Sequence, residues 1–182
     1  IYKIITPVSK IFDIGANTGN FEKICRKYDK DIELNLIDLE ENIKVIKNEP
    51  SLEGCKFHAV DILDNNSKLP KISGAVIMSQ FLDCFSAEQI ISILKRVKEI
   101  AEDSTKIYIL EPFIDRQKYA GAKFSLVHTS LYFTCMANGC SKMYSFKDMS
   151  LFIKEAGLRI NAVYDALGAH DYTLLECVKN DG

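Results

Sequence analysis

Two kinds of hydrophobic pattern alternate along this sequence. Short apolar runs predict buried strands, and stretches in which apolar residues recur every three or four positions predict amphipathic helices. The runs that predict strands are residues 10–14, 32–37, 56–62, 74–81, 106–110, 158–164 and 172–178. The stretches that predict helices are residues 18–28, 40–47, 86–102, 119–137 and 146–156. This alternation favours an α/β fold with a mostly parallel, doubly wound sheet that is covered on both faces.

Several helix boundaries carry their own signals. Ser86, followed by Glu88 and Gln89, is typical of a helix N-terminus. Asn138-Gly139 is typical of a helix end. No repeat, low-complexity segment or linker interrupts the pattern, so we expect a single domain over residues 1–182.

The first predicted strand runs directly into a glycine-bearing turn, Asp13-Ile14-Gly15-Ala16-Asn17-Thr18-Gly19. In an open α/β sheet such a turn lies at the carboxyl end of the strand, where ligands bind. Gly15 and Gly19 let the backbone pass close to a bound molecule, and the following helix offers free N–H groups. The alternative is a nicotinamide-dependent dehydrogenase. Its dinucleotide fingerprint requires a glycine where Asn17 stands, so the sequence disfavours this alternative.

Composition and charge exclude some partners. The chain has 182 residues, of which 47% are hydrophobic and 26% charged, as in an ordinary globular domain. Lys and Arg total 23 against 25 for Asp and Glu, which gives a net charge of −2, and no basic run occurs. We therefore expect neither nucleic acid nor membrane as a partner.

The cysteines indicate a reducing compartment. The six cysteines are scattered, without Cys-x-x-Cys pairs or neighbouring histidines at ligand spacing. They are typical of reduced thiols in a cytoplasmic protein, and we expect no metal site. The sequence opens on Ile-Tyr-Lys rather than on Met and enters a core strand almost at once, so we expect a fragment of a longer protein.

The glycine turn, with Asp38 at the end of the next strand, resembles the cofactor loop of class I S-adenosylmethionine-dependent methyltransferases. The resemblance implies a Rossmann-like seven-stranded sheet whose last strand is antiparallel and lies between the fifth and sixth. It implies S-adenosylmethionine as cofactor, with Asp13 reaching its amino-acid end through ordered groups, Asp38 accepting the ribose hydroxyls, and Asp61 and Ile62 at the adenine. The residues that it places at the cofactor are Asp13, Gly15, Ala16, Asn17, Gly19, Asp38, Leu39, Asp61, Ile62 and Ser79.

Later segments narrow the resemblance to the small-molecule O-methyltransferases, which include plant phenolic and hydroxyindole enzymes. Residues 78–88 resemble that family's Leu-His-Asp-Trp-Ser-Asp-Glu segment, residues 108–112 the strand that carries a catalytic-pair glutamate, and residues 138–142 the Gly-Gly-x-Glu-Arg turn. The similarity extends from about Lys10 to Val178. It implies methylation of a small molecule, at a hydroxyl of an aromatic or polyketide-like acceptor. It also implies a homodimer formed through an N-terminal helical domain that this sequence lacks.

The substrate side departs from the family pattern. Asp83 stands where the family has its catalytic histidine, Ser141 stands where it has a second glutamate, and Glu111 is kept. Two close carboxyl groups in an apolar pocket push one pKa upward. We therefore expect Asp83, tuned by Glu111, to orient or deprotonate the acceptor. Two alternatives remain: Asp83 as a helix N-terminal acid, and a non-catalytic or regulatory S-adenosylmethionine-binding protein.

Aromatic and sulfur-containing side chains are the candidates for an acceptor pocket. The alternative for each is a place in the core. His170, in the last predicted hairpin, is a further candidate at the pocket mouth, whereas His58 is expected to be structural. The residues expected to line the acceptor pocket are Phe81, Phe85, His128, Tyr132 and Met136, with Phe133 and Met143 as further candidates.

Overall fold

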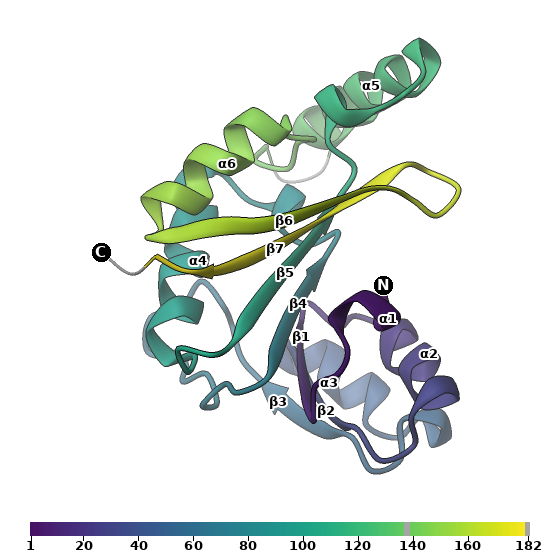
Figure 1. The fold of residues 1–182 in the computed structure, drawn as a ribbon, viewed down its shortest axis with the longest axis vertical. Coiled ribbons are helices and arrows are strands. Elements are labelled where there is room, and N and C mark those ends of the chain that lie inside the picture. Colours follow the sequence, from purple (N-terminus) through teal and green to yellow (C-terminus); the bar gives the residue numbers. More distant parts are fainter. Residues whose placement is uncertain (137–138, 181–182) are drawn as a thin grey trace.

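A seven-stranded sheet forms the centre of the molecule, with strand order β3-β2-β1-β4-β5-β7-β6 (Figure 1). The computed structural model describes residues 1–136 and 139–180. The first five strands pair in parallel, and β7 lies antiparallel between β5 and β6, which confirms the predicted doubly wound topology. The strands are β1 (Lys10–Ile14), β2 (Glu33–Asp38), β3 (Lys56–Ala59), β4 (Ala75–Ser79), β5 (Lys106–Glu111), β6 (Leu158–Leu167) and β7 (Tyr172–Lys179).

Helices cover both faces of the sheet (Figure 1). The helices α1, α2 and α3 pack on one face, and α4 and α6 pack on the other. The α-helices are α1 (Tyr2–Ile5), α2 (Asn20–Tyr28), α3 (Glu40–Ile46), α4 (Ala87–Ile100), α5 (Ala120–Met136) and α6 (Phe146–Glu155). The short 3₁₀ helices are η1 (Pro50–Leu52), η2 (Leu82–Cys84) and η3 (Ile114–Arg116).

The central strands are apolar on both sides because each face of the sheet has its own core. In β4, Val76 and Met78 belong to the core under α4 and α6, whereas Ala75 and Ile77 belong to the core under α1 to α3. Successive side chains of a strand point to opposite faces, so a strand buried on both faces reads as a continuous apolar run.

The predicted start of α4 is confirmed in detail. The Ser86 Oγ accepts a hydrogen bond from the Gln89 N–H at 3.3 Å, and the Gln89 Oε1 accepts one from the Ser86 N–H at 2.9 Å. This capping box satisfies N–H groups that the helix leaves without partners, and the cap stabilises the helix by about 1 kcal/mol. It also fixes the helix start directly after the segment from Gln80 to Phe85.

Several boundaries differ from the sequence-based expectations. The strand expected to reach residue 62 ends at Ala59, because the chain turns at Asp61, whose Oδ1 accepts a hydrogen bond from the Leu63 N–H at 2.9 Å. The strand expected to reach residue 81 ends at Ser79, because Gln80 has a positive φ of 49°. The short helix α1 was not predicted. The expected helix end at Ala137 and the first residue of the predicted stop, Asn138, lie outside the described residues.

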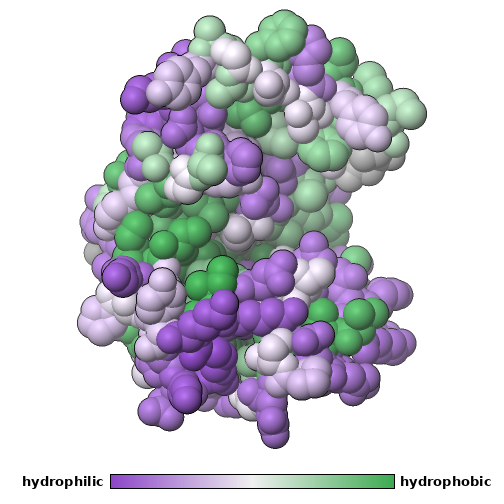
Figure 2. Space-filling model, turned by 90° about the vertical axis from the view of Figure 1, so that its right-hand side faces the viewer, coloured by the Kyte–Doolittle hydropathy of each residue, from purple (hydrophilic) through white to green (hydrophobic). Residues whose placement is uncertain are grey.

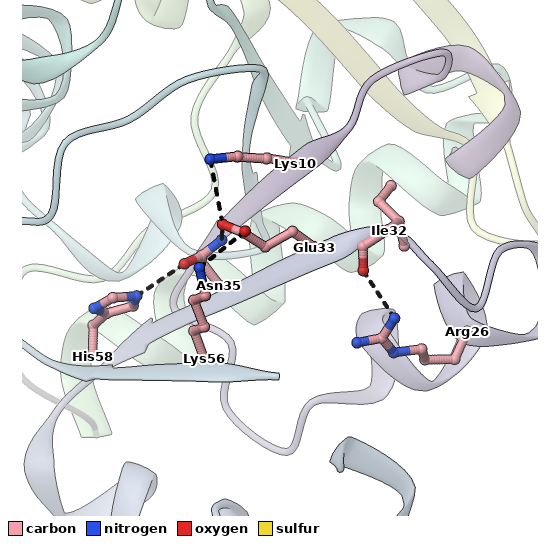
Figure 3. A network of polar contacts seen from close by, with 7 residues as sticks. All are labelled: Lys10, Arg26, Ile32, Glu33, Asn35, Lys56 and His58. Atoms are coloured by element: carbon pink, nitrogen blue, oxygen red, sulfur yellow. Dashed lines mark hydrogen bonds and ion pairs between the residues drawn. The ribbon is translucent and has the colours of Figure 1, made fainter. Parts of the chain in front are cut away.

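A polar network ties the three strands at one side of the sheet together (Figure 3). Glu33 on β2 pairs with Lys10 on β1 and with Lys56 on β3, at 3.8 and 2.9 Å. The Nε2 of His58 lies 3.0 Å from the Oδ1 of Asn35, and burial lowers the pKa of His58. His58 is thus engaged by a neighbouring strand, consistent with the structural role expected for it.

Candidate active site

A pocket of about 270 Å³ opens where β1, β2 and β3 end. In a parallel sheet this edge is where ligands bind. Five of the residues that the sequence assigns to a cofactor line it together: Gly15, Asp38, Leu39, Asp61 and Ile62. Sequence reasoning missed other members of the wall, which are buried strand ends or neighbours of the two acids: Ile14, Ile37, Val60 and Leu63.

The glycine turn is shaped by close packing on two sides. Gly15 has a φ of +82°, and a Cβ there would lie 2.2 Å from the ring of Phe81. Gly19 has a φ of +67°, and a Cβ there would lie 2.5 Å from a methyl carbon of Leu52. Gly15 therefore borders the pocket, whereas Gly19 lets the turn pack against the core.

Asp38 is held firmly at the pocket edge. Its Oδ2 accepts a hydrogen bond from the Asn17 N–H at 2.7 Å, and its Oδ1 accepts from the Leu39 N–H at 2.7 Å and from the Asn42 Nδ2 at 2.8 Å. The bond from Asn17 links the glycine turn to β2. Each carboxylate oxygen can accept more than one hydrogen bond, so this geometry leaves Asp38 able to accept ligand hydroxyls.

Two carboxylates and an apolar wall make this pocket suitable for a nucleoside. Asp38 and Asp61 supply hydrogen-bond acceptors, and Ile62 and Phe85 supply flat or branched apolar surface. A ribose presents hydroxyl donors and an adenine presents an amino donor beside an apolar ring, so the residues present fit both parts.

Asp13 lies beneath the glycine turn rather than in the pocket wall. Its side chain is 3% exposed and is hydrogen-bonded to Glu22 on α2, which is 1% exposed. Burial raises the pKa of both carboxyl groups, and the charge of Glu22 adds to the effect on Asp13. Asp13 shares a strand face with Ile11, which points toward α2, so the alternation of the strand directs it away from the pocket.

The remaining predicted cofactor residues lie close to the pocket edge. Ala16 is buried inside the turn, Asn17 is exposed and contributes its N–H to Asp38, and Ser79 is the last residue of β4. Their assignment to a cofactor remains a prediction.

A second pocket, of about 490 Å³, lies on the other side of the segment that follows β4. Asp83 lines it, together with Phe133 and Met143, which were among the expected residues. Phe81 and Phe85, also expected here, line the first pocket instead, because the chain turns through η2 between them. Ser141, which the resemblance aligns with the family's second glutamate, also lines the pocket, and the members that sequence reasoning missed are Gln80, Cys84 and Thr129.

The face of α5 that meets the second pocket differs from the one expected. Thr129 and Phe133, four residues apart, line the pocket. Tyr132 and Met136 are 62% and 71% exposed, and the exposed His128 lies with its Nδ1 2.8 Å from the Phe124 carbonyl oxygen. A helix turns by about 100° per residue, so an assignment one position away selects a different face. His128, Tyr132 and Met136 thus lie outside the lining of this pocket, and their assignment to the acceptor remains a prediction.

Asp83 and Glu111 come together as the strand order implies. Both line a narrow cavity beside the second pocket. Glu111 is 2% exposed, and its Oε1 accepts hydrogen bonds from the N–H groups of Phe81 and Leu82 at 3.0 and 2.9 Å. Burial raises the pKa of Glu111 well above its usual range and the charge of Asp83 adds to this, while burial also raises the pKa of Asp83. The pair therefore retains a proton to higher pH than exposed carboxyl groups do.

Tyr172, at the start of β7, is a site residue that the sequence analysis missed. Its hydroxyl donates a hydrogen bond to the Gln80 Oε1 at 2.9 Å. Burial raises the pKa of Tyr172, and the charges of Glu111 and Asp83 add to this shift. The expected candidate from the same hairpin was His170, whose ring instead packs edge-on against Tyr172 at 6.1 Å.

Comparison with known protein families shows which family the chain belongs to. The sequence model of the O-methyltransferase domain matches residues 1–159. The chain belongs to this family. The match confirms the resemblance drawn from residues 10–178, and the sheet order with its antiparallel β7 agrees with it.

Solved structures share the O-methyltransferase fold over nearly the whole chain. LaPhzM is 15% identical, with a TM-score of 0.80 over 96% of this chain and 51% of its own. The mitomycin 7-O-methyltransferase MmcR is 14% identical, with a TM-score of 0.79 over 94% of this chain and 49% of its own. The O-methyltransferase NcsB1 from neocarzinostatin biosynthesis, in complex with S-adenosyl-L-homocysteine and 1,4-dihydroxy-2-naphthoic acid, is 17% identical, with a TM-score of 0.75 over 94% and 49%.

The chain thus spans about half the length of these structures. No curated protein sequence matches the chain significantly. In the part of the chain that the structure describes, no helix combines the length and the apolar character needed to cross a bilayer.

Proposed function

We propose that this O-methyltransferase domain transfers a methyl group from S-adenosylmethionine to a hydroxyl of a small aromatic or polyketide-like acceptor. One observation carries the proposal: residues 80–85 form a wall shared by two pockets. Phe81 and Phe85 face the nucleoside-type pocket, whereas Gln80, Asp83 and Cys84 face the other. A cofactor and an acceptor held on the two sides of one short segment would have their reacting ends close together, as group transfer requires.

The first pocket supports the choice of cofactor. Asp38 would accept the ribose hydroxyls, Asp61 the adenine amino group, and Ile62 and Phe85 would enclose the ring. Gly15, which has no side chain, would lie beneath the amino-acid end. When bound, S-adenosylmethionine supplies a sulfonium methyl that is already strongly electrophilic. The chain then has to align the acceptor, exclude water and accept one proton.

We assign the acceptance of that proton to Asp83. It lies at the junction of the second pocket and the narrow cavity that it lines with Glu111. Because burial raises its pKa, Asp83 is a stronger base than an exposed aspartate, whose pKa is about 3.9. Taking the hydroxyl proton as the oxygen attacks would increase the rate by about 10²- to 10⁴-fold.

Binding and turnover measurements distinguish this proposal from its alternatives. Calorimetry with S-adenosylmethionine and with NAD tests the cofactor class, and we expect binding of the first only. A methyl-transfer assay with a set of hydroxylated aromatic compounds tests catalysis. Cofactor binding without transfer to any acceptor would favour the non-catalytic alternative instead.

We also infer that the longer protein is a cytoplasmic homodimer that associates through a domain outside these residues. In support, α5 projects from the body of the molecule and has no buried residue among those described (Figure 1). Pale and green surface is visible at that end of the molecule in Figure 2. Exposed apolar area of this kind is typical of an interaction surface. The large apolar residues exposed on α5 are Phe124, Val127, Leu131, Tyr132 and Met136.

A further inference from the structure

The second pocket and the narrow cavity beside it are lined by acidic side chains and by no basic side chain among the described residues. The two meet at Asp83 and Met143, which line both. Among the described residues that line them, the charged side chains are Asp83 and Glu111, and none is Lys, Arg or His. Among the described residues, an acceptor in the second pocket therefore meets the carboxyl group of Asp83, with Glu111 behind it in the narrow cavity, and no cationic side chain.

Glu111 gives the cavity an unsatisfied acceptor. Its Oε1 is engaged by two backbone N–H groups, but its buried Oε2 has no hydrogen-bond partner among the described residues. Asp83 receives a long hydrogen bond from the Cys84 Sγ at 3.6 Å. The narrow cavity is too small for a water molecule, so Asp83, which also lines the second pocket, is the carboxyl group that a ligand there can reach.

Two basic residues close in sequence to the lining of these cavities make contacts with other groups. The Lys142 Nζ lies over the ring of Tyr144, 4.8 Å from its centre. Arg116 is paired with Asp165. Among the described residues, neither Asp83 nor Glu111 forms an ion pair, although Glu111 is buried and Asp83 is half-buried.

An uncompensated carboxylate in an apolar setting is costly, and a bound cation offsets that cost. The charge of Asp83 disfavours ionisation of Glu111, and whatever charge the two carboxyl groups carry is negative. A ligand carboxylate would add a like charge at short range, whereas a ligand ammonium group would supply the missing positive charge.

We propose that this pocket selects hydroxylated aromatic acceptors that carry a basic amine and discriminates against acceptors that carry a carboxylate. This inference rests on the proposed function, since it assigns the acceptor class of the same site. Gln80 fits the assignment, because its Oε1 already accepts from Tyr172 and its amide nitrogen remains a donor for a neutral acceptor oxygen.

The test uses three hydroxynaphthalenes that differ at one ring position, with an aminomethyl, a methyl or a carboxylate group. Their binding to the chain is measured by calorimetry at pH 7.5 in the presence of S-adenosylhomocysteine. We expect the aminomethyl compound to bind about tenfold or more tightly than the methyl compound, and the carboxylate to bind most weakly. Equal or tighter binding of the carboxylate, or no binding of any of the three, would overturn the proposal.

A variant that removes the charge of Asp83 tests whether this residue causes the preference for the amine. Asp83→Asn should reduce the preference for the amine over the carboxylate, whereas Asp31→Asn, at an exposed turn, should leave it unchanged. Thermal unfolding of both variants checks that they fold, and the ranking in the unmodified chain stands without either variant. If the ranking holds but none of the compounds is methylated, the proposed catalytic function fails while the pocket assignment stands.

Discussion

The single residue with the greatest consequence is Asp83. The resemblance of residues 78–88 leads us to expect Asp83 where the family has a histidine, and the structure has Asp83 and the buried Glu111 lining one narrow cavity beside the second pocket. A carboxylate can replace an imidazole as base only if its pKa is raised, and burial supplies that shift.

Replacing Asp83 with Asn should lower kcat by about 10²-fold or more and leave cofactor affinity unchanged. Because only the ionised carboxylate accepts a proton, the activity of the unmodified chain should rise as pH rises through the raised pKa of Asp83. That rise should be absent in Asp83→Asn. Steady-state rates measured from pH 5 to 9 check both points, and full turnover by Asp83→Asn would exclude the role of base.

Gly15 is the second residue whose identity is dictated by its surroundings. Its positive φ and the ring of Phe81 leave no room for a side chain. Gly15→Ala should lower the free energy of unfolding by about 1–3 kcal/mol and weaken cofactor binding. Gly121→Ala is the matched control, because a Cβ there meets nothing within 4 Å, and it should be neutral or slightly stabilising. Equal stability of the two variants, measured by urea unfolding, would contradict this interpretation.

At the scale of elements, the packing of β1 against α2 depends on a shared proton. Asp13 on the strand and Glu22 on the helix are buried, hydrogen-bonded to each other, and each leaves one oxygen without a partner among the described residues. Asp38 adds negative charge that raises the pKa of Asp13 further. The glycine turn lies between these two elements, so this pair also supports the turn.

The Asp13–Glu22 pair makes stability depend on pH. Its folded-state pKa values lie above the unfolded values of about 4, so the folded chain binds more protons. The free energy of unfolding should therefore fall as pH rises from about 4 through the raised pKa values. Glu22→Gln keeps a hydrogen bond to Asp13 and should be more stable than the unmodified chain at pH 7, by about 1 kcal/mol. Denaturant unfolding across this range checks the slope, which the exposed control Glu41→Gln should not change.

The elements themselves were largely predictable from the sequence, because the apolar runs and the helical spacing report burial directly. Side-chain direction was less predictable. Asp13 was expected to reach the cofactor through ordered groups, and its side chain lies beside Glu22, a contact that its place in the motif did not indicate. Phe81 and Phe85 were assigned to the acceptor, but η2 turns them into the other pocket.

At the scale of the whole molecule, the two pockets are consequences of strand order. The ends of β1, β2 and β3 build one pocket, and the segment between β4 and α4 separates it from the other. The sequence indicated the first pocket well, because Asp38 and Asp61 each come directly after a predicted strand. It indicated the acceptor side poorly, since Thr129 and Tyr172 come to it only through tertiary packing.

The most direct test of the central claim is transfer of a deuterated methyl group. The chain is incubated with S-adenosylmethionine labelled in its methyl group and with hydroxylated aromatic acceptors, and the products are analysed by mass spectrometry. We predict a product that carries the labelled methyl on an oxygen, together with S-adenosylhomocysteine, and its loss in Asp83→Asn. Binding of the cofactor with no labelled product from any acceptor, or label on carbon or nitrogen alone, would contradict the account.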